Sequence, residues 1–357
     1  MTLSQNARIR LGTLAWTALI TLFAAGAPLI WSASPLVFIS AAGLGAAVGV
    51  LSVLIVRTVR GNDWRGTRWL RSSLAGACLA IGAVAAPIYW VVLQPALHPL
   101  SVPRVTLSDG KRQVVFQGMA HVASDQFYRS VVYDLLRARA AGFVLFFEGT
   151  LPGTPEAEAW LDEAVHVQGD LNAQYARIGE ICGLTFQGDF LAFVQRDQSI
   201  DPAHLVSADV SSTEMYEEWK RLVAERPELA QALTAKDQKD GSMTIDGLVE
   251  MVANLGDRQK QVVGAVCRGV LSYILGREES PDPMNAVILD FRNKKLAERV
   301  AAVPNADIYI TYGSAHLPGL FKELQTFDPS WKIVSTAWTT AIVPPDDAVG
   351  NLKTETW

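Results

Sequence analysis

Cysteine is scarce in this chain, and the few cysteines present form no recognisable pattern. Only three of the 357 residues are cysteine, and none has the CxxC spacing of a zinc ribbon. The same scarcity excludes a framework of several disulfides. A single bond between Cys182 and Cys267 stays open as an alternative if this part of the chain is exported.

Clusters of basic residues are also missing from the part of the chain after residue 95. No segment of that part combines grouped Lys and Arg with interleaved aromatic residues. Phosphate contacts need a concentrated basic face, so the sequence excludes nucleic-acid binding.

Charge of either sign is rare in the first 95 residues, which contain seven arginines and one aspartate for a net charge of +6. The remainder holds 24 Lys and Arg against 35 Asp and Glu, a net charge of −11. This contrast predicts two parts that face different solvents.

Three apolar runs without a charged residue occupy the first part, at residues 11–31, 35–56 and 72–93. Each has about the ~20 residues that a helix needs to cross a bilayer. A cleaved signal peptide is the alternative for the first run, but a second run follows at once, which favours three spans. We therefore predict a transmembrane region over residues 1–95. Gly45 and Gly49 within it favour close packing of helices over a dinucleotide-binding loop.

The arginines predict the orientation of these spans. Five of them lie in the second connection, between residues 57 and 71, and two precede the first span. The positive-inside rule places both segments in the cytoplasm. The chain is then a multi-pass protein of the cytoplasmic (inner) membrane, in contact with the lipid bilayer, and its C-terminal domain is extracytoplasmic.

The acidic part has the pattern of an α/β domain. Short apolar runs at residues 114–117 and 143–147 predict buried strands, and residues 124–141 between them have helical periodicity. A second unit of the same kind is predicted from helices at 283–303 and 317–327 and strands at 306–312 and 332–337. We predict a mixed or parallel sheet built from two βαβ-like units over 113–340, after a linker at 96–112 and before a tail at 341–357. Helical segments at 155–182, 213–235, 244–255 and 257–276 predict a helical insertion.

Each unit carries the same four-residue pattern directly after its first strand. Gly118 begins the pattern that ends at His121, and Gly313 begins the pattern that ends at His316. A third strand ends at Glu148. Ligand sites of parallel sheets lie beyond the carboxyl ends of strands, so the three side chains are expected to converge. A lone histidine after a strand is more often a loop or capping residue, but two matched copies with a glutamate favour a site.

Two neutral imidazoles and one carboxylate suit zinc, iron, manganese or cobalt, and they leave positions open for water. Water activated by such an ion hydrolyses amides or esters. Asp189 and Asp209 also follow apolar runs and are candidates for a further ligand. Ser314 lacks the GxSxG elbow of a serine nucleophile. His166 and His204 have no paired partner in the sequence and are expected to be ordinary residues.

Four motifs together resemble the TraB/Tiki family of membrane-tethered metalloproteases, over roughly residues 113–320. They are Gly118-Met119-Ala120-His121-Val122, Phe147-Glu148-Gly149, Asp290-Phe291-Arg292-Asn293-Lys294 and Gly313-Ser314-Ala315-His316-Leu317-Pro318-Gly319.

The resemblance implies a divalent-metal hydrolase that acts on extracytoplasmic peptides or proteins. It places His121, His316 and Glu148 as catalytic and metal-binding residues and Arg292 at a substrate-binding position. Gly118, Gly313 and Gly319 become the structural glycines of the motifs. The three spans depart from the single tether usual in Tiki proteins. Because the wider superfamily includes haem-binding and esterase-like members, the alternative is a non-enzymatic protein that sequesters a signal peptide or haem in the same pocket.

Overall fold

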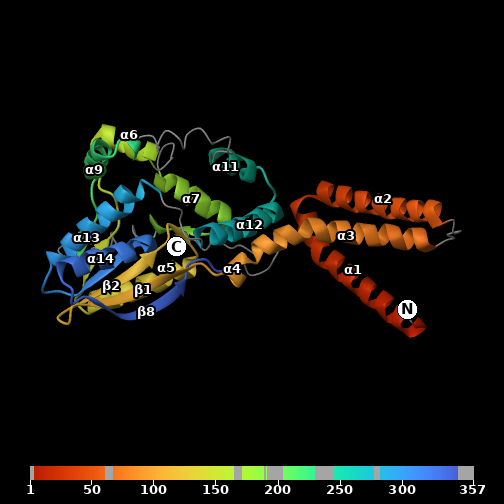
Figure 1. The fold of residues 1–357 in the computed structure, drawn as a ribbon, viewed down its shortest axis with the longest axis horizontal. Coiled ribbons are helices and arrows are strands. Elements are labelled where there is room, and N and C mark those ends of the chain that lie inside the picture. Colours follow the sequence, from red (N-terminus) through yellow and green to blue (C-terminus); the bar gives the residue numbers. More distant parts are fainter. Residues whose placement is uncertain are drawn as a thin grey trace. The chain divides into compact units, whose positions relative to one another are not determined.

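The computed structural model describes residues 4–60, 67–164, 171–188, 190, 204–229, 245–276 and 282–344. These residues belong to two compact units (Figure 1). The first contains the described residues of Met1–Leu97 and Met251–Leu271 together with Pro344, and the second contains those of His98–Glu250 and Ser272–Val343. His166 and Asp189 lie outside the described residues.

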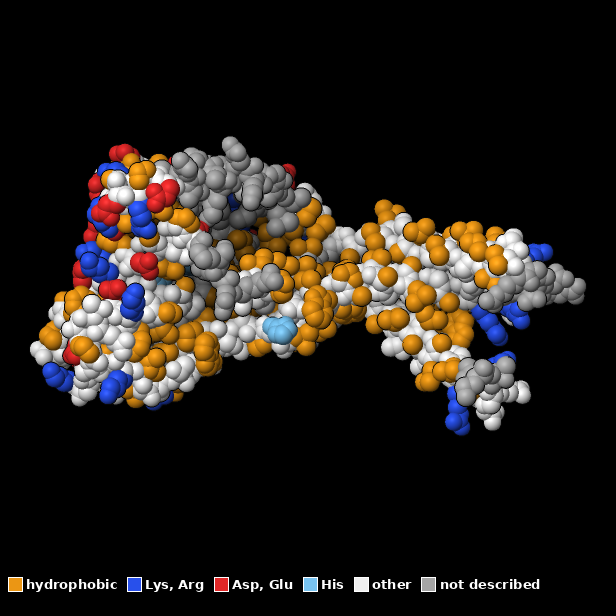
Figure 2. Space-filling view, viewed as in Figure 1, with side chains coloured by type: hydrophobic (Ala, Val, Ile, Leu, Met, Phe, Trp, Pro, Cys, Tyr) orange, Lys and Arg blue, Asp and Glu red, His pale blue; other side chains and the backbone are white. Residues whose placement is uncertain are grey.

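The first unit contains the three predicted spans. Helices α1 (Gln5–Ala33), α2 (Pro35–Arg60) and α3 (Thr67–Val92) are each long and apolar enough to cross a membrane, which confirms the prediction of membrane helices. Apolar side chains cover much of their surface, and arginines lie near their ends (Figure 2). Such a surface is suited to lipid contact.

Helices α2 and α3 touch at glycines. A Cβ atom added at Gly45 would lie 2.3 Å from the carbonyl oxygen of Gly76, and one added at Gly49 would lie 2.1 Å from that of Ser72. A side chain at either position would force the helices apart. The predicted role of these glycines in close helix packing is confirmed.

Helix α12 (Asp257–Leu275) packs its first part on the membrane helices. Val262 shares a buried cluster with Leu29 and Ile81, and the Gln259 side chain donates a hydrogen bond of 2.8 Å to the carbonyl oxygen of Ala33. Residues 251–271, which the sequence placed in the insertion of a domain over 113–340, thus group with the membrane unit. Helical periodicity predicts that one face of α12 is buried. It does not predict which part of the protein covers that face.

The second unit is built on a six-stranded mixed sheet, which confirms the predicted α/β class. The strand order is β6-β4-β7-β2-β1-β8. Strands β2, β7, β4 and β6 are parallel, and β1 is antiparallel to both β2 and β8. The strands are β1 (Ser101–Ser108), β2 (Gln113–Met119), β4 (Val144–Phe147), β6 (Leu205–Ser207), β7 (Ile308–Gly313) and β8 (Lys332–Thr340).

Strand β1 occupies half of the segment 96–112 that was predicted as a linker, and the short helix α4 (Gln94–Leu97) precedes it. The prediction of a linker was wrong because it relied on Pro103. Proline has no backbone N–H for the hydrogen bonds between strands, so it normally indicates that a segment is not a central strand. The start of the predicted tail is also part of the domain. Ala341 and Ile342 are fully buried, and the Ala341 carbonyl accepts a hydrogen bond from the Ser124 N–H.

Helices cover both faces of the sheet. Helices α13 (Arg292–Ala301) and α14 (Leu317–Phe327) bury Leu296 and Leu320 against Phe116 and Ile310. Side chains alternate along a strand, so Val115 and Tyr309 point to the opposite face, where α5 (Asp125–Ala140) lies beside them. The site described below lies at the carboxyl ends of the parallel strands.

The insertion forms a smaller core of its own. Its helices are α6 (Pro155–Ala164), α7 (Leu171–Cys182), α9 (Ser212–Glu225) and the part of α11 (Ile245–Ala253) that precedes Met251. A two-stranded ladder of β3 (Val122–Ala123) and β5 (Thr185–Phe186) accompanies them. Trp160, Trp219 and Val287 are buried together. Val287 belongs to a π-helical turn, Ala286–Phe291, which leads directly into α13. The helix predicted over 283–303 is therefore divided, and π-turns of this kind are frequent at functional sites.

Candidate functional site

One polar side chain follows each of the four parallel strands, at the same edge of the sheet. His121 follows β2, Glu148 follows β4, Asp209 follows β6 and His316 follows β7. Parallel strands end at one edge, so these side chains gather there. The sequence predicted His121, Glu148 and His316 as the site and considered Asp209 as a further ligand.

Glu148 is held through both of its carboxylate oxygens. Arg292 Nη2 donates to Oε1 over 2.8 Å, and the Gly313 backbone N–H donates to Oε2 over 2.5 Å. A Cβ atom at Gly313 would lie 3.3 Å from Oε2. The first glycine of the second motif therefore brings a backbone donor to the carboxylate, and a side chain there would crowd it.

Arg292 joins two carboxylates in a buried network. Its Nε and Nη2 donate to the two oxygens of Asp209 over 2.9 Å and 2.6 Å. Asp209 is 1% exposed and Arg292 is 7% exposed. Burial alone would raise the pKa of Asp209, but the hydrogen bonds and charge of Arg292 outweigh it and hold that pKa below its usual range. The residue predicted to bind substrate also fixes the carboxylates of the site.

His316 is buried, and a hydrogen bond with Asn293 orients its ring. Its Nδ1 lies 2.8 Å from Asn293 Oδ1, an acceptor that requires a hydrogen on Nδ1 and leaves the lone pair on Nε2. Nε2 lies 3.7 Å from Glu148 Oε1. Burial, with a smaller contribution from the Arg292 charge, lowers the pKa of His316 to about 4. The imidazole is therefore neutral at pH 7.

Asn293 was not predicted as a site residue, although it follows Arg292 within a motif that the sequence singled out. It approaches His316 because position 319 is glycine. A Cβ atom at Gly319 would lie 2.0 Å from Asn293 Nδ2, with no room for both groups. The last glycine of the second motif thus makes space for the residue that orients the second histidine.

We predict that Gly319→Ala lowers stability by about 1–3 kcal/mol, the usual cost of overpacking a tight site. Thermal unfolding of the full-length protein in detergent measures the change. Gly256→Ala is the matched control, because a Cβ there meets only Gln259 Oε1 at 3.8 Å. Equal melting temperatures for the two variants would show that Asn293 is free to move aside.

His121 approaches from the other motif. Its Nδ1 lies 2.7 Å from Gln187 Nε2, and its ring stacks on Tyr175 with centroids 4.5 Å apart. The side chain faces solvent, yet the surrounding protein desolvates it enough to lower its pKa, an effect that the Glu148 charge opposes. Gln187 and Tyr175 were not predicted as site residues, because both lie in the insertion, whose packing against the strand ends has no pattern in the sequence.

A cavity of about 560 Å³ opens beside these groups. His121, Glu148 and Arg292 line it from the strand ends, and Tyr175 and Met215 line it from the insertion. Its size falls within the range of small-ligand sites, roughly 300–1,000 Å³.

The donors fit a metal ion in part. His316 Nε2 and Glu148 Oε1 are 3.7 Å apart, a separation that two ligands of one ion can have when each bond is about 2.1 Å. Asn293 supports His316 as outer-shell residues support metal-binding histidines. Within the described ranges, however, no three His, Cys, Asp or Glu side chains are grouped closely enough to hold an ion.

The remaining candidates lie apart from this arrangement. His204 is exposed, as expected for an ordinary surface residue. Ser314 belongs to the single 3-10 turn that carries the chain from β7 to His316. A Cβ at Gly118 would lie 2.9 Å from the Pro103 carbonyl oxygen and 3.1 Å from the Ser314 Cβ. The first glycine of the first motif therefore makes room both for the neighbouring strand β1 and for the second motif.

Comparison with protein-family models, with curated proteins and with solved structures finds no match to this chain.

Proposed function

We propose that this protein is a membrane-anchored, metal-dependent hydrolase that cleaves extracytoplasmic peptides or proteins. One observation carries the proposal: a neutral, buried His316 lies 3.7 Å from Glu148 beside a cavity that His121 also lines. The resemblance of both GxxH motifs and of the Glu148 segment to the TraB/Tiki family supports the same reaction class.

The residues have separate roles in this proposal. Arg292 fixes the Glu148 carboxylate, which accepts a proton from the attacking water. Asn293 fixes the His316 ring so that an unprotonated Nε2 is available at pH 7. His316 and Glu148 would hold a divalent transition metal (manganese, cobalt, zinc or iron), which would supply Lewis-acid activation of water. His121 would become the third ligand by moving closer than it lies among the described residues. The cavity between the strand ends and the insertion receives the peptide.

The location of the site is part of the proposal. Seven arginines flank the spans on the side that the positive-inside rule assigns to the cytoplasm. With the amino terminus in the cytoplasm and three crossings, the domain that follows the third span is extracytoplasmic and anchored in the cytoplasmic membrane.

A reporter fused after Trp357 tests this orientation. We expect an enzyme that is active only outside the cytoplasm, such as alkaline phosphatase, to be active at this position, because three crossings follow a cytoplasmic amino terminus. The same reporter fused after Arg60 is the control and should be inactive. Activity of a cytoplasm-only reporter after Trp357 would overturn the orientation.

Sequestration without cleavage is the second candidate, and the state of Glu148 favours it. Both carboxylate oxygens already accept hydrogen bonds, from Arg292 and from Gly313. If the Glu148 carboxylate serves only to stabilise this edge of the sheet, the cavity can bind a signal peptide or haem but does not cleave it.

Incubation of the purified full-length protein with a peptide library separates the two candidates. We expect cleavage products by mass spectrometry with manganese, cobalt or zinc present, and none after chelation. Recovery of retained but intact peptides would instead favour sequestration. The full chain is required, because part of α12 is buried against the membrane helices.

A further inference from the structure

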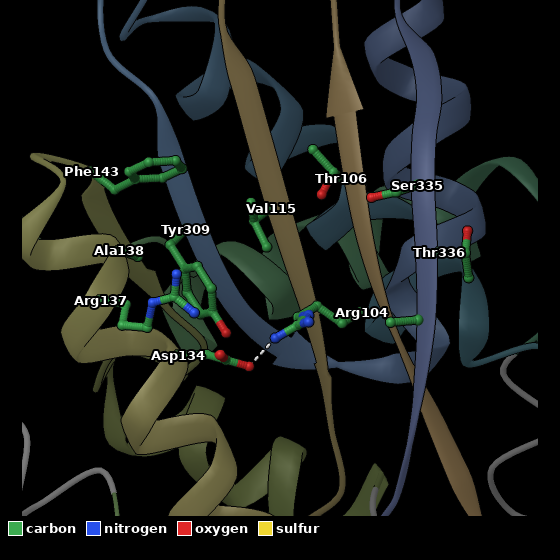
Figure 3. Close-up of a pocket in the computed structure, with 11 residues that line it drawn as sticks. Arg104, Thr106, Val115, Asp134, Arg137, Ala138, Phe143, Tyr309, Ser335 and Thr336 are labelled. Atoms are coloured by element: carbon green, nitrogen blue, oxygen red, sulfur yellow. Dashed lines mark hydrogen bonds and ion pairs between the residues drawn. The ribbon is translucent and has the colours of Figure 1, made fainter.

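A second cavity lies away from the strand-end site, on the α5 face of the sheet. It has a volume of about 330 Å³ and is lined by α5 together with strands β1, β2, β7 and β8 (Figure 3). Its residues do not overlap with those of the cavity beside His121 and Glu148. The volume is at the lower end of the range for small-ligand sites.

Charged groups converge in this cavity. Arg104 of β1 pairs with Asp134 of α5, and Arg137 extends from the next turn of the helix toward Tyr309 (Figure 3). Within the part of the chain that the structure describes, Arg137 contacts the ring of Tyr133 but pairs with no carboxylate. Two guanidinium groups and one carboxylate leave one positive charge uncompensated.

The Tyr309 hydroxyl is the second unusual feature. Tyr309 is 3% exposed, and its hydroxyl is one of the buried polar atoms without a hydrogen-bond partner among the described residues. It is directed toward the Asp134 carboxylate, which is engaged with Arg104 (Figure 3). A buried hydroxyl without a partner costs free energy, so its retention calls for an explanation.

We propose that this cavity binds a small organic carboxylate. The ligand carboxylate would lie between Arg104 and Arg137, since guanidinium groups bind carboxylates through paired hydrogen bonds. Asp134, released from Arg104, would accept a hydrogen bond from the Tyr309 hydroxyl, so every polar group gains a partner. Val115, Ala138 and Phe143 also line the cavity and suit an apolar body on the ligand. The remaining lining includes the hydroxyl side chains of Thr106, Ser335 and Thr336, which can hydrogen-bond a polar substituent. A single excess positive charge matches a monoanion better than a phosphate dianion.

Calorimetric titration of the full-length protein in detergent with benzoate tests the proposal, with inorganic phosphate as the competing anion. We expect saturable benzoate binding that Arg137→Gln weakens about tenfold, the loss of one charge-assisted hydrogen bond. Arg137 is exposed, so the substitution should leave folding intact. Arg226→Gln, at the exposed end of α9, is the matched control and should bind benzoate as the wild type does.

Tyr309→Phe provides an independent variant. It removes only the unpartnered hydroxyl, so without ligand it should melt no lower than the wild type, yet it should bind benzoate several-fold more weakly. The proposal is overturned if the wild type does not bind benzoate, if phosphate binds and benzoate does not, or if both variants retain wild-type affinity.

Discussion

Replacement of Arg292 by methionine is expected to destabilise the protein by about 3–5 kcal/mol, the cost of removing one partner from a buried ionic network. The substitution leaves the Asp209 carboxylate, whose side chain is 0% exposed, without its bidentate partner and removes one of two donors to Glu148. The Asp209 carboxylate has no access to water that could replace Arg292, whereas Glu148 still faces the cavity. Thermal unfolding of the full-length variant in detergent measures the loss as a large decrease in melting temperature.

Arg221→Met is the control for this prediction. Arg221 pairs with Glu218 and Glu225 on the surface of α9, and its side chain is 52% exposed. Surface pairs of this kind contribute about 0–1 kcal/mol, so the melting temperature should change little. If the two variants melted at the same temperature, the network of Arg292 would not contribute to the fold as described.

Glu148→Gln is expected to lower kcat/KM for peptide cleavage by about 10²–10⁴-fold, the usual contribution of a positioned acid–base group. Glutamine has the same shape and keeps one carbonyl oxygen, but it cannot accept a proton from water. The amide nitrogen of the glutamine must face a donor, either Arg292 or the Gly313 N–H, so we expect a loss of stability of about 1–3 kcal/mol. The fold should be retained, because Arg292 keeps both bonds to Asp209. The kinetics are measured on a peptide that the wild type cleaves.

Glu156→Gln is the matched substitution outside the strand-end site. Glu156 lies in the first turn of α6, where it accepts a hydrogen bond from the Tyr216 hydroxyl. The variant should cleave peptide at the wild-type rate. Wild-type turnover by Glu148→Gln would remove Glu148 from the mechanism and favour its structural role.

Much of the sheet could be predicted from the sequence. The apolar runs before His121, Glu148 and His316 became β2, β4 and β7, because continuous apolar segments of this length indicate strands buried on both faces. Parallel strands end at one edge, so the same reasoning placed the three side chains together. The order of the strands could not be predicted, since β7 lies between β2 and β4, which are consecutive in their βαβ-like unit.

The groups that support the site were harder to predict. Asn293 and Asp209 reach it through tertiary packing, and the sequence contains no periodicity that reports such contacts. Gly319 was recognised as part of a motif. The reason why this position is glycine is the space that the Asn293 side chain needs, and that space depends on how α13 packs against α14. Strand β1 was missed because local proline chemistry argued against it, whereas pairing with β2 and β8 stabilises it in the fold.

The rate of peptide cleavage by a His121→Ala/His316→Ala double variant tests whether the strand-end histidines and Glu148 form one hydrolytic site. The purified full-length variant is compared with the wild type on the same peptide, with manganese, cobalt or zinc present. We expect metal-dependent cleavage by the wild type and none by the variant, although the variant still folds. Cleavage by the double variant at the wild-type rate, or a wild type that cleaves no peptide with any of these metals, would contradict this expectation.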